Sequence, residues 1–411
     1  MIRFVSFLII ALLGFSNSSN AMPHGGSSAA GKSKNETTCT IASLTCAKAP
    51  SVSFGPEGKL WLAWVFAGHI YVQHSSDEGK TYSTPSVVNR APEKIAARAE
   101  NRAKIQLDSA GNIYISWTQS LNKMYTGNIR FSRSVDGGQS FSQPITVNDD
   151  LQEISHRFDS MVVSGDGKVF ISWLDKRDQQ AAKDKQQEYI GGALYYSYSA
   201  DQGKAFSKNM KLSDNSCVCC RIAMALDNNN LPVIAWRDIY GDAKNQIRDH
   251  SLFTFSSALK PDKKIRLSNE QWRINGCPHH GPALDVDGNN VVHSTWFSDT
   301  DSDYVLFYGN STNDYKAMAF GQADKQSAHP YVLTLNQTVF LVWKEFDGKK
   351  TDILMKVSKD AGISWNKEEV ISTTRGSSDH PLLVKNSKAV YLSWFSENEG
   401  YRFIALSEQK K

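Results

Sequence analysis

The residues best suited to chemistry fall in two short segments of the sequence, Cys-Val-Cys-Cys-Arg and Cys-Pro-His-His-Gly. Their candidate metal ligands are Cys217, Cys219, Cys220, Cys277, His279 and His280. Thiolate sulfur and imidazole nitrogen together suit soft or borderline metal ions. The sequence therefore predicts a metal site, with copper as Cu(I) or zinc as Zn(II) as the expected ion.

Disulfide bonds are the competing interpretation of the same cysteines. The chain has six cysteines, and an even number allows a fully paired framework. Cys39 and Cys46 are close enough in sequence to close a local loop, and Cys277 could pair with a cysteine of the other segment. The spacing leaves both interpretations open, complete pairing or use of some cysteines for metal or redox chemistry.

Arginine and aspartate residues near these segments indicate a second kind of chemistry. Arginine binds planar carboxylates, and aspartate can act as a general acid or base. The candidate catalytic residues are Arg157, Asp159, Arg237, Asp238 and Arg248. Neighbouring pairs such as Arg237 and Asp238 are equally consistent with ion pairs between structural units.

A repeated unit must position all of these residues. A short apolar run that ends in tryptophan recurs seven times, at Trp64, Trp117, Trp173, Trp236, Trp296, Trp343 and Trp394. Alternating apolar and polar residues between Gly, Asp and Asn turns indicate strands and hairpins, and no segment shows a convincing helical pattern. The sequence predicts an all-β fold, a single β-propeller of four-stranded blades, with seven blades favoured over six.

A second motif, Ser-x-Asp-x-Gly-x-x-aromatic, follows the third predicted strand of four repeats. Its aspartates are Asp77, Asp136, Asp201 and Asp360. An aspartate can accept hydrogen bonds from loop N–H groups, and glycine adopts the positive φ of a tight turn. Because the motif recurs around the ring, its aspartates are expected to be structural rather than catalytic.

With these motifs the chain resembles the Asp-box (BNR-repeat) propellers, the superfamily that includes sialidases, over roughly residues 45–411. A sialidase would have six blades, an arginine triad, a Tyr/Glu nucleophile pair, an Asp acid/base and an Arg-Ile-Pro motif, so the resemblance implies these features here. This sequence has no Arg-Ile-Pro, and its nearest string is Arg-Ile-Ala at Arg221. The resemblance is therefore to a Cys/His-rich, non-typical member of the superfamily.

Propeller topology predicts where the site lies. The loop before the first strand of each blade, here called the leading loop, and the loop after the second strand belong to one end of the ring. The hairpin motifs belong to the other end. Five of the ten histidines fall in leading loops, namely His156, His279, His280, His329 and His380. Cysteine, histidine and charged residues are therefore expected to gather at the end opposite the hairpins.

Composition and the termini restrict the cellular setting. The formal net charge is +4, and no segment combines dense Lys/Arg with aromatic residues, which excludes a nucleic-acid partner. Arg3 followed by an apolar run and small residues before Ala21 is typical of a signal peptide, so export to the periplasm or the medium is expected. No segment is long enough to span a membrane. The predicted organisation is a signal peptide over 1–21, a flexible segment over 22–38 and a propeller domain over 39–411.

Three functions are consistent with this sequence. The favoured one is an exported propeller whose Cys/His cluster binds copper, zinc or another small ligand. The second is an exo-glycosidase of the sialidase type. The third is a non-catalytic ring that binds a glycan or a protein at its loops. The expected partner is a metal ion, small molecule or glycan, and the oligomeric state is left open.

Overall fold

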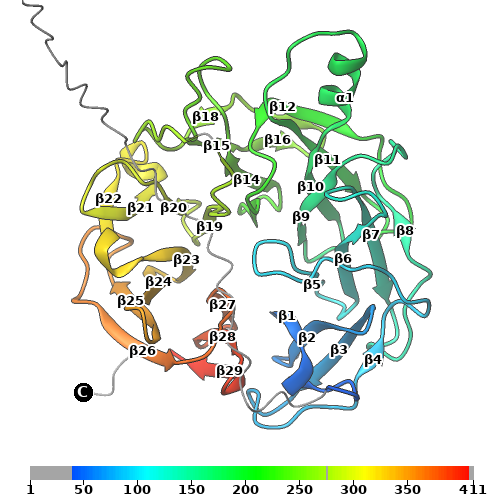
Figure 1. Ribbon diagram of the computed structural model, residues 1–411. Coiled ribbons are helices and arrows are strands. Elements are labelled where there is room, and N and C mark those ends of the chain that lie inside the picture. Colours follow the sequence, from blue (N-terminus) through cyan, green and yellow to red (C-terminus); the bar gives the residue numbers. More distant parts are fainter. Residues whose placement is uncertain (1–38, 275, 407–411) are drawn as a thin grey trace, which may run out of the picture. The chain divides into compact units, whose positions relative to one another are not determined.

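Seven antiparallel sheets form the blades of a β-propeller in the computed structural model, which describes residues 39–274 and 276–406 (Figure 1). The predicted signal peptide and flexible segment lie outside the described residues. Each blade is built from strands that follow one another in the sequence. The prediction of seven blades rather than six is confirmed.

The first four blades cover the N-terminal part of the ring. Blade 1 contains β1 (Lys48–Phe54), β2 (Leu60–Phe66), β3 (His69–Ser75) and β4 (Ser86–Val87). Blade 2 contains β5 (Lys104–Leu107), β6 (Ile113–Ser120), β7 (Gly127–Ser134) and β8 (Ile145–Thr146). Blade 3 contains β9 (His156–Val163), β10 (Val169–Asp175), β11 (Gly192–Ser199) and β12 (Met210–Ser216). Blade 4 contains β13 (Ala223–Leu226), β14 (Pro232–Arg237), β15 (His250–Phe253) and β18 (Ile265–Arg266), with a separate hairpin of β16 (Phe255–Ser257) and β17 (Lys260–Pro261).

The remaining three blades complete the ring. Blade 5 contains β19 (Ala283–Val286), β20 (Val292–Phe297), β21 (Tyr304–Asn310) and β22 (Met318–Gln322). Blade 6 contains β23 (Ala328–Leu335), β24 (Thr338–Phe346), β25 (Thr351–Ser358) and β26 (Glu369–Thr374). Blade 7 contains β27 (Leu382–Lys385), β28 (Val390–Ser396) and β29 (Gly400–Ala405). Short 3₁₀ turns occur at Leu44–Cys46, Ser311–Asn313 and Ala323–Lys325.

The ring closes where blade 7 meets blade 1, with β27 against β1 (Figure 1). Blade 7 has three strands where the repeat predicts four, and the described part of the chain from Cys39 onward contains no strand before β1. Instead, Leu44 packs in the same apolar cluster as Tyr401 and Phe403. Apolar side-chain packing of the N-terminal segment against β29, rather than a fourth strand, therefore covers this part of blade 7.

The seven tryptophans of the repeat form the centre of the blade packing. Each lies on the second strand of its blade and is at most 1% exposed. Burial of one such side chain contributes about 4–6 kcal/mol of apolar transfer free energy before conformational entropy is subtracted. The indole N–H is also satisfied in most blades, as in the bonds of Trp117 to Glu93 and of Trp296 to Glu270. The tryptophan repeat is therefore a packing device.

The four hairpin motifs join third and fourth strands, as predicted. In blade 2, Asp136 Oδ1 accepts hydrogen bonds from the hydroxyl of Ser134 at 2.7 Å and from the N–H of Ser140 at 3.0 Å. Gly138 has φ +80° and donates its N–H to Ser134 Oγ. The other three copies repeat the Ser–Asp and Gly–Ser bonds. These contacts confirm that the aspartates of the motif are turn residues.

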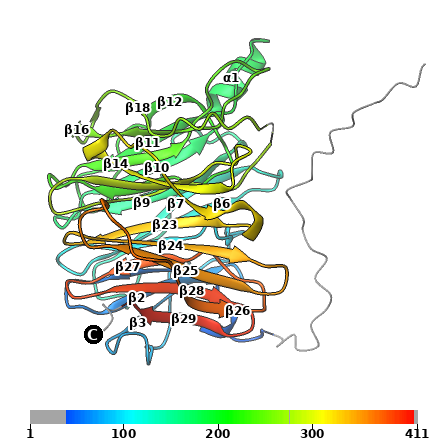
Figure 2. The ribbon, with the colours of Figure 1, turned by 90° about the vertical axis from the view of Figure 1, so that its left-hand side faces the viewer.

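One helix, α1 (Arg177–Asp184), lies in the insertion that follows β10. This helix was not predicted, because no segment of the sequence shows a convincing helical pattern. Figure 2 shows α1 projecting beyond the strands of its blade. Among the described residues, no helix is both long and apolar enough to cross a membrane.

Candidate functional site

A cleft of about 1190 Å³ opens at the end of the propeller opposite the hairpins. Its walls come from leading loops and from loops that follow second strands, as the topology predicted. Residues that line it include Arg157, Cys219, Cys277, His279, His329 and His380. A smaller cavity of about 160 Å³ lies among the first strands, and Glu100 and His380 line both spaces. The cleft therefore leads to the central channel.

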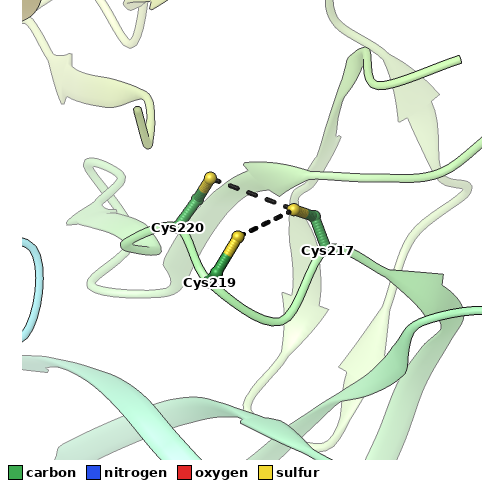
Figure 3. Close-up of side chains that lie close together, drawn as sticks. All are labelled: Cys217, Cys219 and Cys220. Carbon is green, nitrogen blue, oxygen red and sulfur yellow. Dashed lines mark hydrogen bonds between the residues drawn. The ribbon is translucent and has the colours of Figure 1, made fainter. Parts of the chain in front are cut away.

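Three cysteine sulfurs converge in the leading loop of blade 4 (Figure 3). Cys217 Sγ lies 3.6 Å from Cys219 Sγ and 3.9 Å from Cys220 Sγ. All three side chains are buried, and all three thiols are free. These separations are far longer than a disulfide bond of about 2.05 Å. The loop therefore gathers thiols without joining them.

Positive charge stabilises the thiolate form in this loop. Arg248 Nη1 donates to Cys217 Sγ at 3.2 Å. Hydrogen bonds from Cys219 and Cys220, together with the charge of Arg248, hold the pKa of the Cys217 thiol well below its usual range. Burial raises the pKa of Cys220. Cys217 is thus the sulfur best prepared to act as an anionic ligand.

Cys277 approaches the same cluster from the leading loop of blade 5. It is exposed to the cleft, and a hydrogen bond from Cys219 lowers its pKa to about 6. His279 is tied to this cluster through its Nδ1, which donates to the carbonyl oxygen of Cys219 at 2.9 Å. Cys39 and Cys46 are disulfide-bonded, as the local-loop prediction expected. The other four cysteines are free, so the interpretation with all six paired is not what the structure shows.

His280 belongs to a different cluster from the cysteines. Its ring stacks on His329, with centroids 4.4 Å apart, and His329 stacks on His380 at 3.3 Å. Burial lowers the pKa of all three imidazoles, that of His380 to about 3, so the rings are neutral at neutral pH. Three blades contribute one ring each to this stack. His156, the fifth leading-loop histidine, is fully buried and donates to the carbonyl of Gly127 rather than facing the cleft.

One carboxylate organises the loops beneath the stack. Glu100 Oε2 accepts the N–H groups of Arg221 and Gly281, both at 3.0 Å, and Glu100 Oε1 accepts Arg221 Nη1 at 2.6 Å. Burial raises the pKa of Glu100, but the charge of Arg221 brings it well below its usual range. A Cβ on Gly281 would lie 2.3 Å from Arg221 Cγ. Glycine at this position therefore permits the close approach of two leading loops.

Arg157 is the one candidate catalytic residue that lines the cleft. Its guanidinium lies 5.1 Å from the ring centroid of Phe158 and 5.9 Å from that of Tyr125, which is 73% exposed. Burial and the nearby charge of Arg98 lower the pKa of Arg157. Within residues 39–274 and 276–406 it has no carboxylate partner at ion-pair distance. The wall formed by blades 1–3 is therefore cationic, since Lys48, Lys94, Arg98, Arg157 and Lys176 line it.

The remaining candidate catalytic residues have structural partners. Asp159 is buried and accepts hydrogen bonds from Ser116 and Thr118, and Asp238 is buried and pairs with Lys264 at 2.9 Å. Neither lines the cleft.

The other two candidate arginines, Arg237 and Arg248, do not line the cleft either. Arg237 donates to the carbonyl oxygens of Arg248, His280 and Phe297. Arg237 therefore joins the loops that carry the two clusters, whereas Arg248 contacts Cys217.

Glu100 is the functional-site residue that sequence reasoning missed. In the leading loop of blade 2, Arg102 forms a buried bidentate pair with Asp379, with both N–O distances 2.8 Å. Glu100 stands two positions earlier in the same loop. Its position in a leading loop was the available signal, but no local pattern distinguishes an acidic residue that faces the channel from one that faces solvent.

No protein-family model matches the sequence, and no curated protein is similar to it. Among solved structures, an ulvan lyase of a new polysaccharide lyase family, bound to -[GlcA(1-4)Rha3S]-, has a TM-score of 0.55 at 8% identity, covering 88% of this chain and 94% of its own. The polysaccharide lyase Uly1 has a TM-score of 0.52 at 8% identity, covering 88% and 90%. A protein of unknown function from Dyadobacter fermentans has a TM-score of 0.50 at 14% identity, covering 78% and 96%. At these identities the likeness establishes the propeller fold alone, and it does not extend to sialidase-like membership.

Proposed function

We propose that this chain is a metal-binding propeller that holds a thiophilic ion, Cu(I) or Zn(II), in the thiol cluster of Cys217, Cys219, Cys220 and Cys277. The observation that carries the proposal is the spacing of the sulfurs. Ligands about 2.3 Å from a tetrahedral zinc ion are about 3.8 Å apart. The two measured sulfur separations, 3.6 and 3.9 Å, lie on either side of that value.

The surroundings of the cluster fit an anionic thiolate site. Three bound thiolates carry more negative charge than a mono- or divalent ion neutralises, and Arg248 supplies a compensating positive charge at 3.2 Å. Burial of Cys217, Cys219 and Cys220 excludes water from the ion. Cys277, exposed at the cleft, offers a fourth sulfur and an entrance for the ion.

Anaerobic titration of the full chain with Cu(I) and with Zn²⁺, each against a chromogenic competitor, tests this function. One ion per chain is expected, and C217S combined with C220S should abolish binding. C277S separates the two metals, because a tetrahedral zinc site would lose a ligand, whereas a trigonal Cu(I) site of the other three sulfurs would persist. The paired substitution C39S/C46S is the matched control and should leave binding unchanged. Absence of reactive thiols in the native protein, or binding unaffected by C217S/C220S, would overturn the proposal.

The cationic wall of the cleft supports a second function, binding of an anionic glycan. Arg157 is desolvated without a carboxylate partner among the described residues, and the exposed ring of Tyr125 lies beside it. Arginine pairs with planar carboxylates, and an aromatic ring can contact the apolar face of a sugar. Asp159 and Asp238 do not line the cleft, so neither supplies an acid or base to a glycan bound there.

Titration with a polyuronate and with a neutral glycan separates this second function from a general affinity for sugars. Binding of the polyuronate alone is expected, weakened by salt and at least 10-fold by R157A. K168A, at a surface ion pair with Asp166, is the matched control. Equal binding of both glycans would contradict an anion-specific cleft.

A further inference from the structure

The imidazole stack and Glu100 form a second cluster of metal-ligating atoms, separate from the thiols. The nearest ligand atoms of Glu100, His329 and His380 all lie within 4.8 Å of one another. His380 Nδ1 lies 3.2 Å and His329 Nδ1 lies 3.6 Å from the same atom, Glu100 Oε1. All three residues line the cleft. Two imidazoles and one carboxylate therefore face a common point at the floor of the cleft.

Hydrogen bonding alone does not account for this arrangement. A carboxylate offers about four lone-pair positions, two on each oxygen. The backbone N–H groups of Arg221 and Gly281 occupy Oε2, and Arg221 Nη1 takes one position on Oε1. One position is left for two imidazole nitrogens. Both Nδ1 atoms are buried, and neither forms a hydrogen bond of good geometry to Glu100 or to another described residue.

The two rings also pack unusually closely. Aromatic rings usually pack with centroids about 4.5–7 Å apart, whereas those of His329 and His380 are 3.3 Å apart and nearly parallel. Nitrogen and oxygen ligands about 2.1 Å from a transition-metal ion are about 3.0–3.4 Å apart. The separations from Glu100 Oε1 are close to that range.

We propose that His329, His380 and Glu100 bind a divalent transition-metal ion of borderline softness, such as Zn²⁺, in a His₂Glu site whose remaining coordination positions open into the cleft. Three protein ligands with an open position are the arrangement of catalytic rather than structural zinc sites. Arg221 orients the carboxylate, as outer partners of metal ligands do. His280 stacks on His329 and holds its ring in place. This site is independent of the thiol cluster and differs from it in ligand chemistry.

Titration with Co²⁺ distinguishes the two sites, because a thiolate ligand adds a charge-transfer band that nitrogen and oxygen ligands do not. In the full chain carrying C217S, C219S, C220S and C277S, we expect one equivalent of Co²⁺ with visible ligand-field bands and no thiolate band. Zn²⁺ should displace it. H329A and H380A should each weaken binding at least 10-fold, since even outer partners of metal ligands are worth about 10- to 100-fold. H74Q, which removes a half-buried histidine on β3 that does not line the cleft, is the matched control.

Failure of this site is distinguishable from failure of the thiol site. The variant in which all four free cysteines are replaced by serine is here called the four-serine chain. If it folds but binds no Co²⁺ or Zn²⁺, or if H329A and H380A leave its binding unchanged, the His₂Glu site is overturned, whatever the wild-type chain binds. If the four-serine chain does not fold, the wild-type chain and its H329A variant are compared. The site is supported if the H329A variant binds one equivalent of Co²⁺ fewer than the wild-type chain and the lost equivalent shows no thiolate band. The site is overturned if the H329A variant binds as many equivalents as the wild-type chain.

Discussion

At the hairpin end of the propeller, Asp136 takes its hydrogen bonds from Ser134 and Ser140 of its own turn, and the other motif aspartates do the same. At the cleft end, Glu100 takes its hydrogen bonds from residues of blades 4 and 5 that are distant in sequence. The hairpin contacts are local and repeat around the ring. The cleft contacts exist only once the ring has closed. The hairpin aspartates therefore depend on their own turns, whereas the position of Glu100 depends on loops of other blades.

The largest change in stability is expected from a substitution at the cleft end, in the ion pair of Arg102 and Asp379. Both side chains are 8% exposed, and the pair joins blade 2 to the segment that leads into blade 7. D379A leaves the guanidinium buried without its partner, so we expect a loss of about 3–5 kcal/mol in the free energy of unfolding. Chemical denaturation measures it. The surface pair of Lys59 and Glu57 is the control, and E57A should change stability by less than about 0.5 kcal/mol. Equal effects of the two substitutions would remove the distinction.

Substitution of two glycines of blade 5 allows the two ends of strand β19 to be compared directly. Gly281 precedes β19 at the cleft end, where an added Cβ would lie within 2.7 Å of three atoms of Arg221. Gly288 follows β19 at the other end, where an added Cβ would meet nothing within 4 Å. G281A should therefore cost about 1–3 kcal/mol of stability through overpacking and weaken metal binding at the His₂Glu site. G288A should change stability by no more than about 1 kcal/mol, and thermal unfolding with metal titration measures both. A neutral G281A would show that the loops tolerate more separation than the structure indicates.

The smallest effect is expected in a single hairpin. D136A removes the local hydrogen bonds of one turn and should cost about 1–2 kcal/mol, with no change in metal binding. The pH dependence gives a second measurement. Hydrogen bonds from Ser140 and Ser134 lower the pKa of Asp136 from its ordinary 3.8 to about 2. Its contribution is therefore complete above about pH 4 and is lost as the pH falls towards 2. Thermal unfolding of wild type and D136A should converge over that interval, and a constant difference down to pH 2 would contradict this origin.

The sequence by itself determined the repeated part of this protein. Trp117 and its counterparts recur because every blade must bury one face against the next, and Asp136 and its counterparts recur because every such hairpin needs the same turn contacts. Repetition makes both visible without a structure. The sequence also placed Cys217, Cys219 and Cys220 in one predicted loop, but their convergence depends on the local backbone, because adjacent side chains of an extended segment point to opposite faces.

The tertiary structure alone decided which non-repeated residues share a site. Asp159 and Asp238 were predicted as catalytic candidates, but Asp159 accepts hydrogen bonds from Ser116 and Thr118 of blade 2 and Asp238 pairs with Lys264. Glu100 gave no signal, although it contacts residues of other blades. His280 was grouped with the cysteines, yet it stacks on His329 of the next blade. The physical reason is that the cleft is assembled from leading loops far apart in sequence. Their side-chain directions depend on the curvature of the closed ring and on close approaches such as that at Gly281, and no local pattern of residues encodes either.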